Sequence, residues 1–293
     1  MVSIIIPTYN AAESLPGLFQ SINNQDVSTE EIIIDSSSSD NTIDIARYFG
    51  AHVLSISKEE FGHGKTRNLA ASNANGEIIV FLTQDCILEN NDAISCLVES
   101  LKEEQIAASY GRQIAAEDAI PTEKFARLYN YPKKPIIKGK EQVWEMGIKT
   151  FFFSNVFSAI RRKEFEEIGG FPENLIMFED MLLAAKLIER GYKIAYVPEA
   201  KVIHSHDYSL KQQLRRYYQA GISFQKNPWF MKYAGANKEG ILFIKEEMKY
   251  LFKGKEYIWL PYAILEAASK YTGYKAGLYR NRLPRFINKG AVS

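Results

Sequence analysis

The sequence has little cysteine: Cys86 and Cys96 are the only two in 293 residues. Two cysteines are too few for a disulfide framework or a cysteine-ligated zinc site, so a reducing cytosol is the simplest compartment. Met1 leads directly into "VSIIIPTYN", without the basic flank, long apolar stretch and cleavage site of a signal peptide. We therefore expect a cytoplasmic protein.

Long hydrophobic runs are also missing, because no span approaches the ~20 uncharged apolar residues that a transmembrane helix needs. Neither sign of charge is in excess, since 36 basic and 35 acidic residues leave a net charge of +1. Any anionic ligand must therefore be held by local groups, and nucleic acid is not expected as a partner. A hydrophobic content of 46% can fill the core of a large α/β domain.

Two glycine-rich nucleotide-binding motifs are absent as well. There is no G-x-G-x-x-G after the first apolar run and no G-x-x-x-x-G-K-[ST] anywhere. Their absence disfavours dinucleotide-dependent oxidoreductases and P-loop enzymes.

What the first 90 residues do contain is four short apolar runs separated by helical patterns. The runs are "VSIIIP", "EIIIDS", "HVLSIS" and "EIIVFLTQD". They are continuous and rich in Ile and Val, which is typical of strands buried on both faces of a parallel sheet. Helical spacing or helix-ending glycines occur between them, near residues 15–22, 41–50 and 65–75. This alternation predicts an open, mostly parallel, doubly wound α/β sheet.

The composition changes near residue 210. Before it, residues 91–101 and 179–189 look helical, while 112–150 resemble a long loop. After it, the chain becomes helical, aromatic and basic. We expect an α/β domain over residues 1–210 and a helical C-terminal region over 211–293.

Polar residues follow three of the predicted strands, at the edge where open parallel sheets bind ligands. Asp and Asn also favour turns through side-chain to backbone hydrogen bonds, so each has a purely structural alternative. Two aspartates at two strand ends nevertheless favour a ligand site. The strand-end residues are Pro7, Thr8, Tyr9, Asn10, Asp35, Ser36, Gln84 and Asp85.

Four segments in order resemble the family 2 glycosyltransferases, which are nucleotide-sugar-dependent enzymes with a GT-A fold. They read "VSIIIPTYNAAESL", "EIIIDSSSSDNT", "GKTRNLAASNANGEIIVFLTQD" and "MFEDMLLAAKLIERGYKIAYVP". "EFGHGKTRN" with "FLTQD" is most similar to the bacterial branch that uses dTDP-L-rhamnose. The resemblance covers residues 1 to about 220. It implies a nucleotide-sugar half at about 1–110 and an acceptor half at about 111–210.

The resemblance implies that the strand-end residues bind the nucleotide sugar. Asp35 could accept the N3 hydrogen of uracil or thymine, which cytosine lacks, and residues 7–10 would shape the base pocket. Arg67, at a helix start, would suit a diphosphate, with His63 and Lys65 on the same turn. A cap role for Asp35 and an exposed surface position for Arg67 are the alternatives. The implied residues are Pro7, Thr8, Tyr9, Asn10, Asp35, Ser36, Arg67, Gln84 and Asp85.

Asp85 stands where the family usually has two aspartates, spaced D-x-D, that hold a divalent cation bridging two phosphates. Here Gln84 precedes it and position 83 is Thr. One carboxylate with phosphate oxygens and waters can still ligate Mg²⁺ or Mn²⁺. On a strand, His204 and His206 would share a face, and His206 is the better second ligand by position. Ordinary half-buried strand-end histidines are the alternative.

The pair Glu179 and Asp180 in "FED" matches the family's E-D pair, whose aspartate is the catalytic base. Inverting transfer needs one base to take the acceptor hydroxyl proton while the anomeric carbon is attacked opposite the leaving diphosphate. Glu179 would contact the acceptor. A helix N-terminus would lower the pKa of Asp180, and N-capping is its structural alternative.

In "QQLRRYYQAG", the residues Gln213, Arg216 and Tyr217 nearly match the Q-x-x-R-W of membrane synthases in this family, with Tyr for Trp. Those enzymes thread polymer through transmembrane helices. This sequence has no such helix, so we expect an amphipathic helix beside the acceptor site and a single transfer.

Aromatic and basic residues are mixed along residues 224–287. Such a mixture suits a membrane interface, and a lipid-linked acceptor would make peripheral attachment to the inner face of the cell membrane useful. Packing on another subunit, and hence an oligomer, is the alternative. The aromatic residues are Trp229, Phe230, Tyr233, Phe243, Tyr250, Phe252, Tyr257, Trp259, Tyr262, Tyr271, Tyr274, Tyr279 and Phe286.

Together these features predict an inverting glycosyltransferase that moves L-rhamnose from dTDP-L-rhamnose, with Mg²⁺ or Mn²⁺, onto a saccharide or polyprenyl-linked saccharide of a bacterial surface polysaccharide. The same fold with a UDP-hexose or UDP-N-acetylhexosamine donor stays open. A non-catalytic nucleotide-sugar-binding assembly subunit is the other alternative, although Asp35, Asp85 and Asp180 at matching positions disfavour it.

Overall fold

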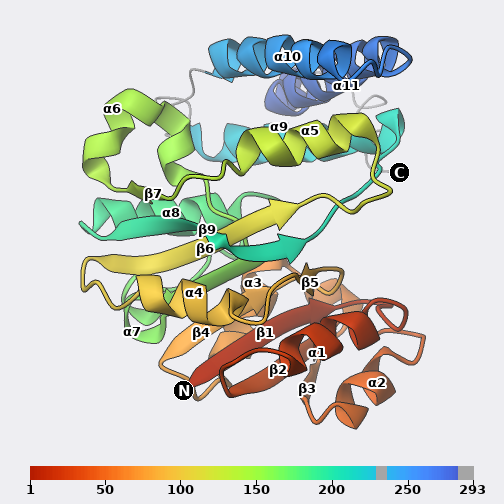
Figure 1. Ribbon diagram of the computed structural model, residues 1–293. Helices are drawn as coiled ribbons and strands as arrows, with labels where there is room; N and C mark the ends of the chain where they lie inside the picture. Colours follow the sequence, from red (N-terminus) through yellow and green to blue (C-terminus); the bar gives the residue numbers. More distant parts are fainter. Residues whose placement is uncertain (229–235, 283–293) are drawn as a thin grey trace.

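The computed structural model describes residues 1–228 and 236–282, with the backbone alone for 236–238. A nine-stranded sheet forms its centre, and three long helices lie at one end (Figure 1). Trp229, Phe230, Tyr233 and Phe286 of the predicted aromatic region lie outside the described residues.

The elements alternate between strand and helix along most of the chain. The strands are β1 (Val2–Thr8), β2 (Thr29–Asp35), β3 (His52–Ser55), β4 (Ile78–Leu82), β5 (Ile87–Leu88), β6 (Ile106–Ile114), β7 (Ile136–Lys138), β8 (Phe157–Arg161) and β9 (Lys193–Ile203). The helices are α1 (Leu15–Asn23), α2 (Thr42–Tyr48), α3 (His63–Ala71), α4 (Ala93–Ser100), α5 (Pro121–Asn130), α6 (Val143–Met146), α7 (Arg162–Glu167), α8 (Glu179–Glu189), α9 (Leu210–Lys226), α10 (Ala236–Lys253) and α11 (Trp259–Leu278).

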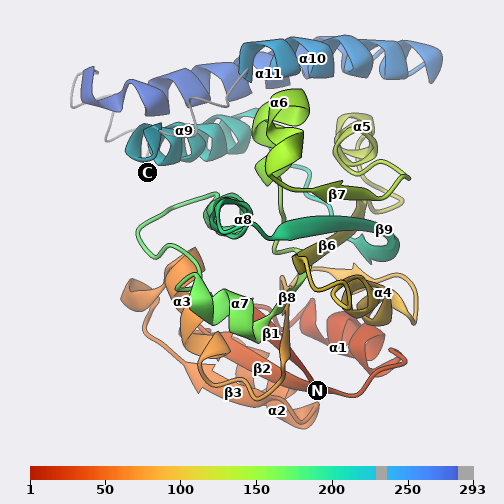
Figure 2. The same cartoon turned by 90° about the vertical axis from the view of Figure 1, so that its left-hand side faces the viewer.

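The sheet follows the order β3-β2-β1-β4-β8-β6-β9-β5, and β7 pairs with β9. The first four strands are parallel to one another, as their buried Ile and Val runs predict. β8 then runs antiparallel to both β4 and β6, while β6 and β9 are parallel. Figure 2 shows α3, α7 and α8 on one face and α1 and α4 on the other. The predicted doubly wound α/β fold is therefore confirmed.

Residues 112–150 are not the long loop that their composition suggests. They include α5, β7 and α6. Pro121 occupies the first turn of α5, where its missing N–H costs no hydrogen bond. Prolines and lysines in this segment are therefore compatible with regular structure.

Strand register brings the predicted polar residues to one edge of the sheet. β1 and β2 are paired so that Thr8 lies beside Asp35, the last residues of the two strands. β4 ends at Leu82, so Asp85 follows three residues later at the same edge. Buried apolar clusters on both faces, including Ile5 and Ile34 on one and Ile4 and Ile33 on the other, hold these strand ends in place.

The C-terminal helices form a separate layer. α9 and α11 pack closely because Gly221 and Gly277 leave room, since a Cβ on Gly277 would lie 2.0 Å from the carbonyl oxygen of Tyr218. Figures 1 and 2 both show α10 and α11 outermost, at the end of the molecule opposite β3 and α2. Within residues 1–228 and 236–282, none of the helices combines the length and apolar character needed to cross a membrane.

Candidate active site

Asp35 is fully buried at the end of β2. Its Oδ1 accepts hydrogen bonds from Thr8 Oγ1 at 3.0 Å and Ser38 Oγ at 2.5 Å, and its Oδ2 accepts one from the Ser38 N–H at 2.8 Å. The carboxylate therefore does stabilise a turn, while Oδ2 keeps capacity for one more donor. Ser36 is also buried, and its hydroxyl has no partner within the described part of the chain.

Asn10 holds the loop after β1 against the loop after β2. Its backbone has φ +48°, a left-handed conformation that asparagine tolerates better than most residues. Its N–H donates to Ser38 Oγ at 2.7 Å, and its Oδ1 accepts from the Ser39 N–H at 2.9 Å. These contacts shape the surface beside Asp35 that sequence reasoning assigns to the base.

Gln84 binds the main chain of Tyr9 in both directions. Its Oε1 accepts from the Tyr9 N–H at 2.8 Å, and its Nε2 donates to the Tyr9 carbonyl at 3.2 Å. An aspartate at this position has no donor for the second bond. Tyr9 itself is exposed, with Lys58 Nζ 4.7 Å from its ring centre and 2.9 Å from its hydroxyl.

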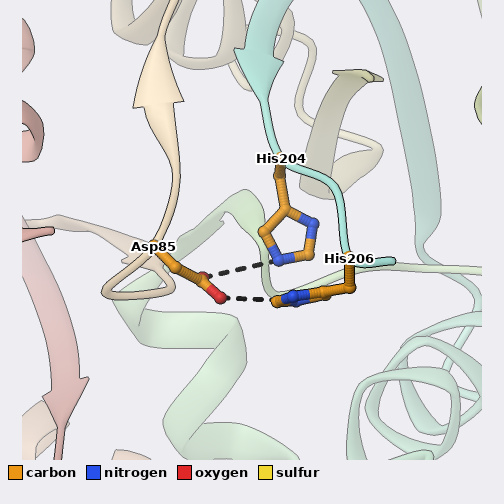
Figure 3. Close-up of side chains that lie close together, drawn as sticks. All are labelled: Asp85, His204 and His206. Carbon is orange, nitrogen blue, oxygen red and sulfur yellow. Dashed lines mark ion pairs between the residues drawn. The ribbon is translucent and has the colours of Figure 1, made fainter. Parts of the chain in front are cut away.

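Asp85 faces two histidines that follow β9 (Figure 3). Its Oδ1 lies 3.4 Å from His204 Nε2, and its Oδ2 lies 3.3 Å from His206 Nε2. The three ligand atoms lie within 4.8 Å of one another, which is the spacing of a divalent cation site. The residues sequence reasoning proposed as ligands, Asp85 and His206, are thus brought together. His204, ranked below His206 by sequence position, points to the same place.

The ionisation of this cluster suits a cation. Partial burial would raise the pKa of Asp85, but the hydrogen bond and charge of His204 and the charge of His206 outweigh it, so the pKa lies below its usual range. Burial and the charge of His204 lower the pKa of His206 to about 4. Near neutral pH, Asp85 is then ionised and His206 neutral, the forms that bind metal.

Gln113, near the end of β6, orients His204. Its Nε2 donates to Tyr131 Oη at 2.5 Å and Ser154 Oγ at 2.9 Å, so its Oε1 faces His204 Nδ1 at 3.1 Å. In a neutral His204, Nδ1 then carries the proton and the Nε2 lone pair points at Asp85. A cation or a proton between them relieves this repulsion. Sequence reasoning missed Gln113, because a polar residue inside a strand carries no ligand signature.

Asp180 lies in the first turn of α8 but does not cap it. The N-cap is Phe178, which has φ +70° and no capping side chain. Asp180 Oδ1 accepts from the Met181 N–H at 2.8 Å, and Oδ2 accepts from the Asn155 N–H at 3.4 Å. Burial, reinforced by the adjacent Glu179 carboxylate, raises the pKa of Asp180 to about 7. The expectation that the helix end lowers this pKa is wrong, since these two effects are larger.

Glu179 forms a buried ion pair with Arg67. The Arg67 Nη1 lies 3.1 Å from Glu179 Oε1 and also donates to the His63 carbonyl at 3.0 Å. Arg67 is 6% exposed, which rules out the surface alternative, and its Nε is buried without a partner among the described residues. His63 and Lys65 are exposed on the same turn.

The family model for glycosyl transferase family 2 matches residues 3–169. The chain is also 42% identical over 287 residues to the O-antigen chain rhamnosyltransferase RfbN of Salmonella typhimurium, an alignment covering 97% of this chain and 91% of the relative. The chain belongs to glycosyltransferase family 2. The O-antigen chain rhamnosyltransferase WbaN of Salmonella anatum is likewise 42% identical, with 96% and 90% covered.

Solved structures with the same fold are more distant from this glycosyltransferase in sequence. The mannosyltransferase PcManGT from Pyrobaculum calidifontis, in complex with GDP-Man and Mn²⁺, gives a TM-score of 0.65 at 19% identity, covering 95% of this chain and 87% of that one. S. aureus TarS in complex with UDP-GlcNAc gives 0.55 at 16% identity, covering 96% and 91%. At these identities the likeness establishes the GT-A fold.

Arg216 of this glycosyltransferase is a further cation near Asp85, His204 and His206. The near match to Q-x-x-R-W had pointed to this residue in the sequence. It lies on α9, stacks 4.4 Å from the ring of Tyr208 and donates to the Tyr208 hydroxyl at 3.0 Å. The Tyr208 ring is 4.9 Å from that of His206. Gln213 of the same motif is instead buried, with its Nε2 2.9 Å from Glu266 of α11.

Proposed function

We propose that this glycosyltransferase transfers L-rhamnose, with inversion, from dTDP-L-rhamnose to a saccharide or polyprenyl-linked saccharide of a bacterial surface polysaccharide. The observation that carries the proposal is the 42% identity, over nearly the whole chain, to two O-antigen chain rhamnosyltransferases. A UDP-hexose or UDP-N-acetylhexosamine donor is the second candidate. Its support is the complex of TarS with UDP-GlcNAc, at 16% identity.

Asp180 is the proposed catalytic base. Its carboxylate would take the proton of the acceptor hydroxyl while that oxygen bonds to the anomeric carbon, and the bond to dTDP breaks on the opposite face. A pKa of about 7 keeps part of Asp180 ionised at neutral pH yet basic enough to accept a proton. Glu179, which is paired with Arg67, adjoins Asp180 in the first turn of α8 and would contact the acceptor.

The proposed ligands of a divalent cation are Asp85, His204 and His206, whose donor atoms fit one ion. Two imidazole nitrogens with one carboxylate favour Mn²⁺ over Mg²⁺, which prefers oxygen. Such a cation would neutralise the diphosphate charge that develops on the leaving dTDP. Arg216, an exposed guanidinium beside His206, would bind the same diphosphate. Arg67 would support it from the α3 side.

The proposed nucleotide contacts are at the ends of β1 and β2. Asp35 Oδ2 accepts a single hydrogen bond from the described residues and can accept one more, which the N3–H of thymine or uracil would supply. Ser36 is the next residue of the chain, and its buried hydroxyl has no partner among the described residues. Pro7, Thr8, Tyr9 and Asn10 would line the base, and Gln84 would hold Tyr9 in place.

We also propose that the outer face of α10 and α11 rests on a membrane. Apolar side chains that are more than half exposed occur along α10, α11 and the segment that joins them, and Lys245, Lys249 and Lys253 of α10 are exposed as well. Rings and aliphatic groups would enter the headgroup region, while the lysines would meet anionic lipid. The exposed apolar residues include Ile241, Phe252, Ile258, Ile264, Leu265 and Tyr271.

The donor assignment can be tested by thermal unfolding with dTDP-L-rhamnose, dTDP-glucose, UDP-glucose and UDP-N-acetylglucosamine, each with and without Mn²⁺. A donor that binds the native state raises the melting temperature. We expect the largest increase with dTDP-L-rhamnose and Mn²⁺. A larger increase with a UDP-sugar would favour the second candidate, and no increase with any donor would refute the binding site.

A further inference from the structure

A cavity of about 380 Å³ lies between the end of β6, α5 and α10. Three cationic residues line it: Arg112 from β6, and Lys124 and Arg127 from α5. Glu117 is the acidic residue of the lining, and it is exposed. The mechanism proposed above uses none of these side chains.

Arg112 is the most informative residue of the cavity. Its Nε is buried without a hydrogen-bond partner, and its guanidinium forms no ion pair within the described part of the chain. A guanidinium stays charged at physiological pH, and leaving a buried donor such as this Nε unpaired costs free energy. An oxyanion in the cavity would satisfy it with the geometry that arginine prefers.

The other two cations are partly engaged but keep free donors. Lys124 Nζ donates to the Glu117 carbonyl at 2.6 Å, which leaves two of its three hydrogens. Arg127 pairs with Glu123 at 2.7 Å and donates from Nε to the His204 carbonyl at 2.9 Å. The lining of the cavity therefore carries more positive than negative charge.

The cavity adjoins the proposed active site. Gln113 is part of its lining, and the same side chain contacts His204 and Ser154. Asn155, next along the chain, donates its N–H to Asp180. A ligand held in the cavity could therefore extend toward the catalytic carboxylate.

The lining of the cavity also includes large apolar and aromatic side chains. Leu128 is 51% exposed there, and Tyr250 extends from α10, the helix whose outer face carries exposed apolar and basic residues. Oxyanion recognition inside and apolar surface outside match a lipid diphosphate better than a free phosphate. We propose that this cavity binds the diphosphate of a polyprenyl-linked acceptor, which rests on the proposed function above.

The test uses farnesyl diphosphate as a probe, measured by isothermal titration calorimetry in EDTA so that the cation site plays no part. Inorganic pyrophosphate and farnesol are the two comparison arms, representing a free anion and a lipid without charge. The variants are Arg112→Gln and Lys124→Gln. Arg47→Gln, an exposed arginine on α2 at the opposite end of the molecule, is the matched control.

We expect farnesyl diphosphate to bind wild type at least about tenfold more tightly than pyrophosphate or farnesol. Arg112→Gln should raise its Kd about tenfold, Lys124→Gln should raise it several-fold, and Arg47→Gln should leave it unchanged. Equal Kd values for wild type and both cavity variants would overturn the proposal. Equal affinity for pyrophosphate and farnesyl diphosphate would overturn the claim that the bound diphosphate belongs to a lipid. If Arg112→Gln does not fold, Lys124→Gln decides alone.

A parallel titration with dTDP-L-rhamnose and Mn²⁺ separates this proposal from the donor assignment. If the donor binds but binding of farnesyl diphosphate does not depend on the cavity residues, only the cavity proposal is rejected. If farnesyl diphosphate binding depends on the cavity residues but dTDP-L-rhamnose does not bind, the donor assignment is rejected and the oxyanion site in the cavity is kept.

Discussion

The side-chain amide of Gln84 forms two hydrogen bonds with the peptide groups that flank Tyr9, accepting from its N–H and donating to its carbonyl. This relationship gives Gln84, the residue that precedes Asp85, a structural role, because an aspartate at position 84 could not donate the second bond. The side chain of Gln84 connects the end of β4 to the end of β1. The candidate cation ligands are then Asp85 and the two histidines that face it.

Gln84→Met removes both bonds while keeping side-chain length. We expect the free energy of unfolding to fall by about 1 kcal/mol, since a typical hydrogen bond contributes about that much and these lie near the surface. The donor KM should rise while kcat changes little, because Tyr9 moves and Asp180 does not. Urea unfolding and steady-state kinetics measure the two effects. The control is Gln105→Met, an exposed glutamine, and equal effects in both variants would contradict the explanation.

Asp180→Asn should reduce transfer by about 10³-fold or more while leaving donor binding nearly intact, because it removes the general base. In wild type the base must be unprotonated and its pKa is about 7, so kcat/KM should rise with pH and level off above neutrality. Measuring kcat/KM as a function of pH around neutrality checks the direction of this change. Turnover that is retained in Asp180→Asn would refute the role of this residue.

Asp180→Asn should lower activity but raise the stability of the folded protein at high pH. The pKa of Asp180 is higher in the folded protein than the usual 3.8, so its stabilising contribution is present at low pH and is lost as pH rises through about 7. Asp180→Asn should therefore unfold at higher denaturant concentration than wild type at pH 8, with the difference shrinking toward pH 4. A less stable variant at pH 8 would contradict the raised pKa.

Gln113→Leu should weaken Mn²⁺ binding by about tenfold, because His204 loses the partner that orients it. Gln113→Glu can still accept the Nδ1 proton and should keep most of the affinity. His204→Ala serves as the reference for losing a ligand, and His52→Ala, an exposed histidine on β3, as the control. Electron paramagnetic resonance of free Mn²⁺ measures the Kd. Equal affinity in Gln113→Leu and wild type would exclude this orienting role.

Membrane contact through α10 and α11 predicts that Ile241→Ser, Phe252→Ser and Ile258→Ser together lower binding to vesicles that contain phosphatidylglycerol, by roughly fivefold or more. Tyr48→Ser, which removes an 85% exposed aromatic on α2, should leave binding unchanged. Cosedimentation measures both. Unchanged sedimentation of the triple variant would favour the alternative, in which this face packs on another subunit.

Local patterns were enough to predict the α/β class and the parallel N-terminal strands. Ile4, Ile5 and Ile6 are all fully buried, because a central strand of a doubly wound sheet has both faces covered. Helix α8 begins at Glu179 and ends at Glu189, the predicted bounds, because its apolar spacing continues to the glycine at 191. The antiparallel insertion of β8 could not be predicted, since strand direction depends on contacts between distant segments.

The candidate site was predictable only where a residue type has a chemical signature. Asp85 and His206 have such a signature, and the fold brings them to 3.3 Å. Gln113 and the cavity around Arg112 depend on tertiary contacts that no short motif encodes. The pairing of Arg67 with Glu179, a contact across 112 positions of sequence, likewise could not be predicted from a motif.

The most direct test of the central claim is sugar incorporation into lipid-linked saccharides. Purified protein, Mn²⁺ and membrane extracts containing polyprenyl-linked saccharides would be incubated with radiolabelled dTDP-L-rhamnose or radiolabelled UDP-glucose, with Asp180→Asn in parallel. We predict label in the lipid fraction from dTDP-L-rhamnose with wild type, and none above background with Asp180→Asn or UDP-glucose. Incorporation from UDP-glucose but not from dTDP-L-rhamnose would contradict the proposed donor, and equal incorporation by Asp180→Asn would contradict the proposed base.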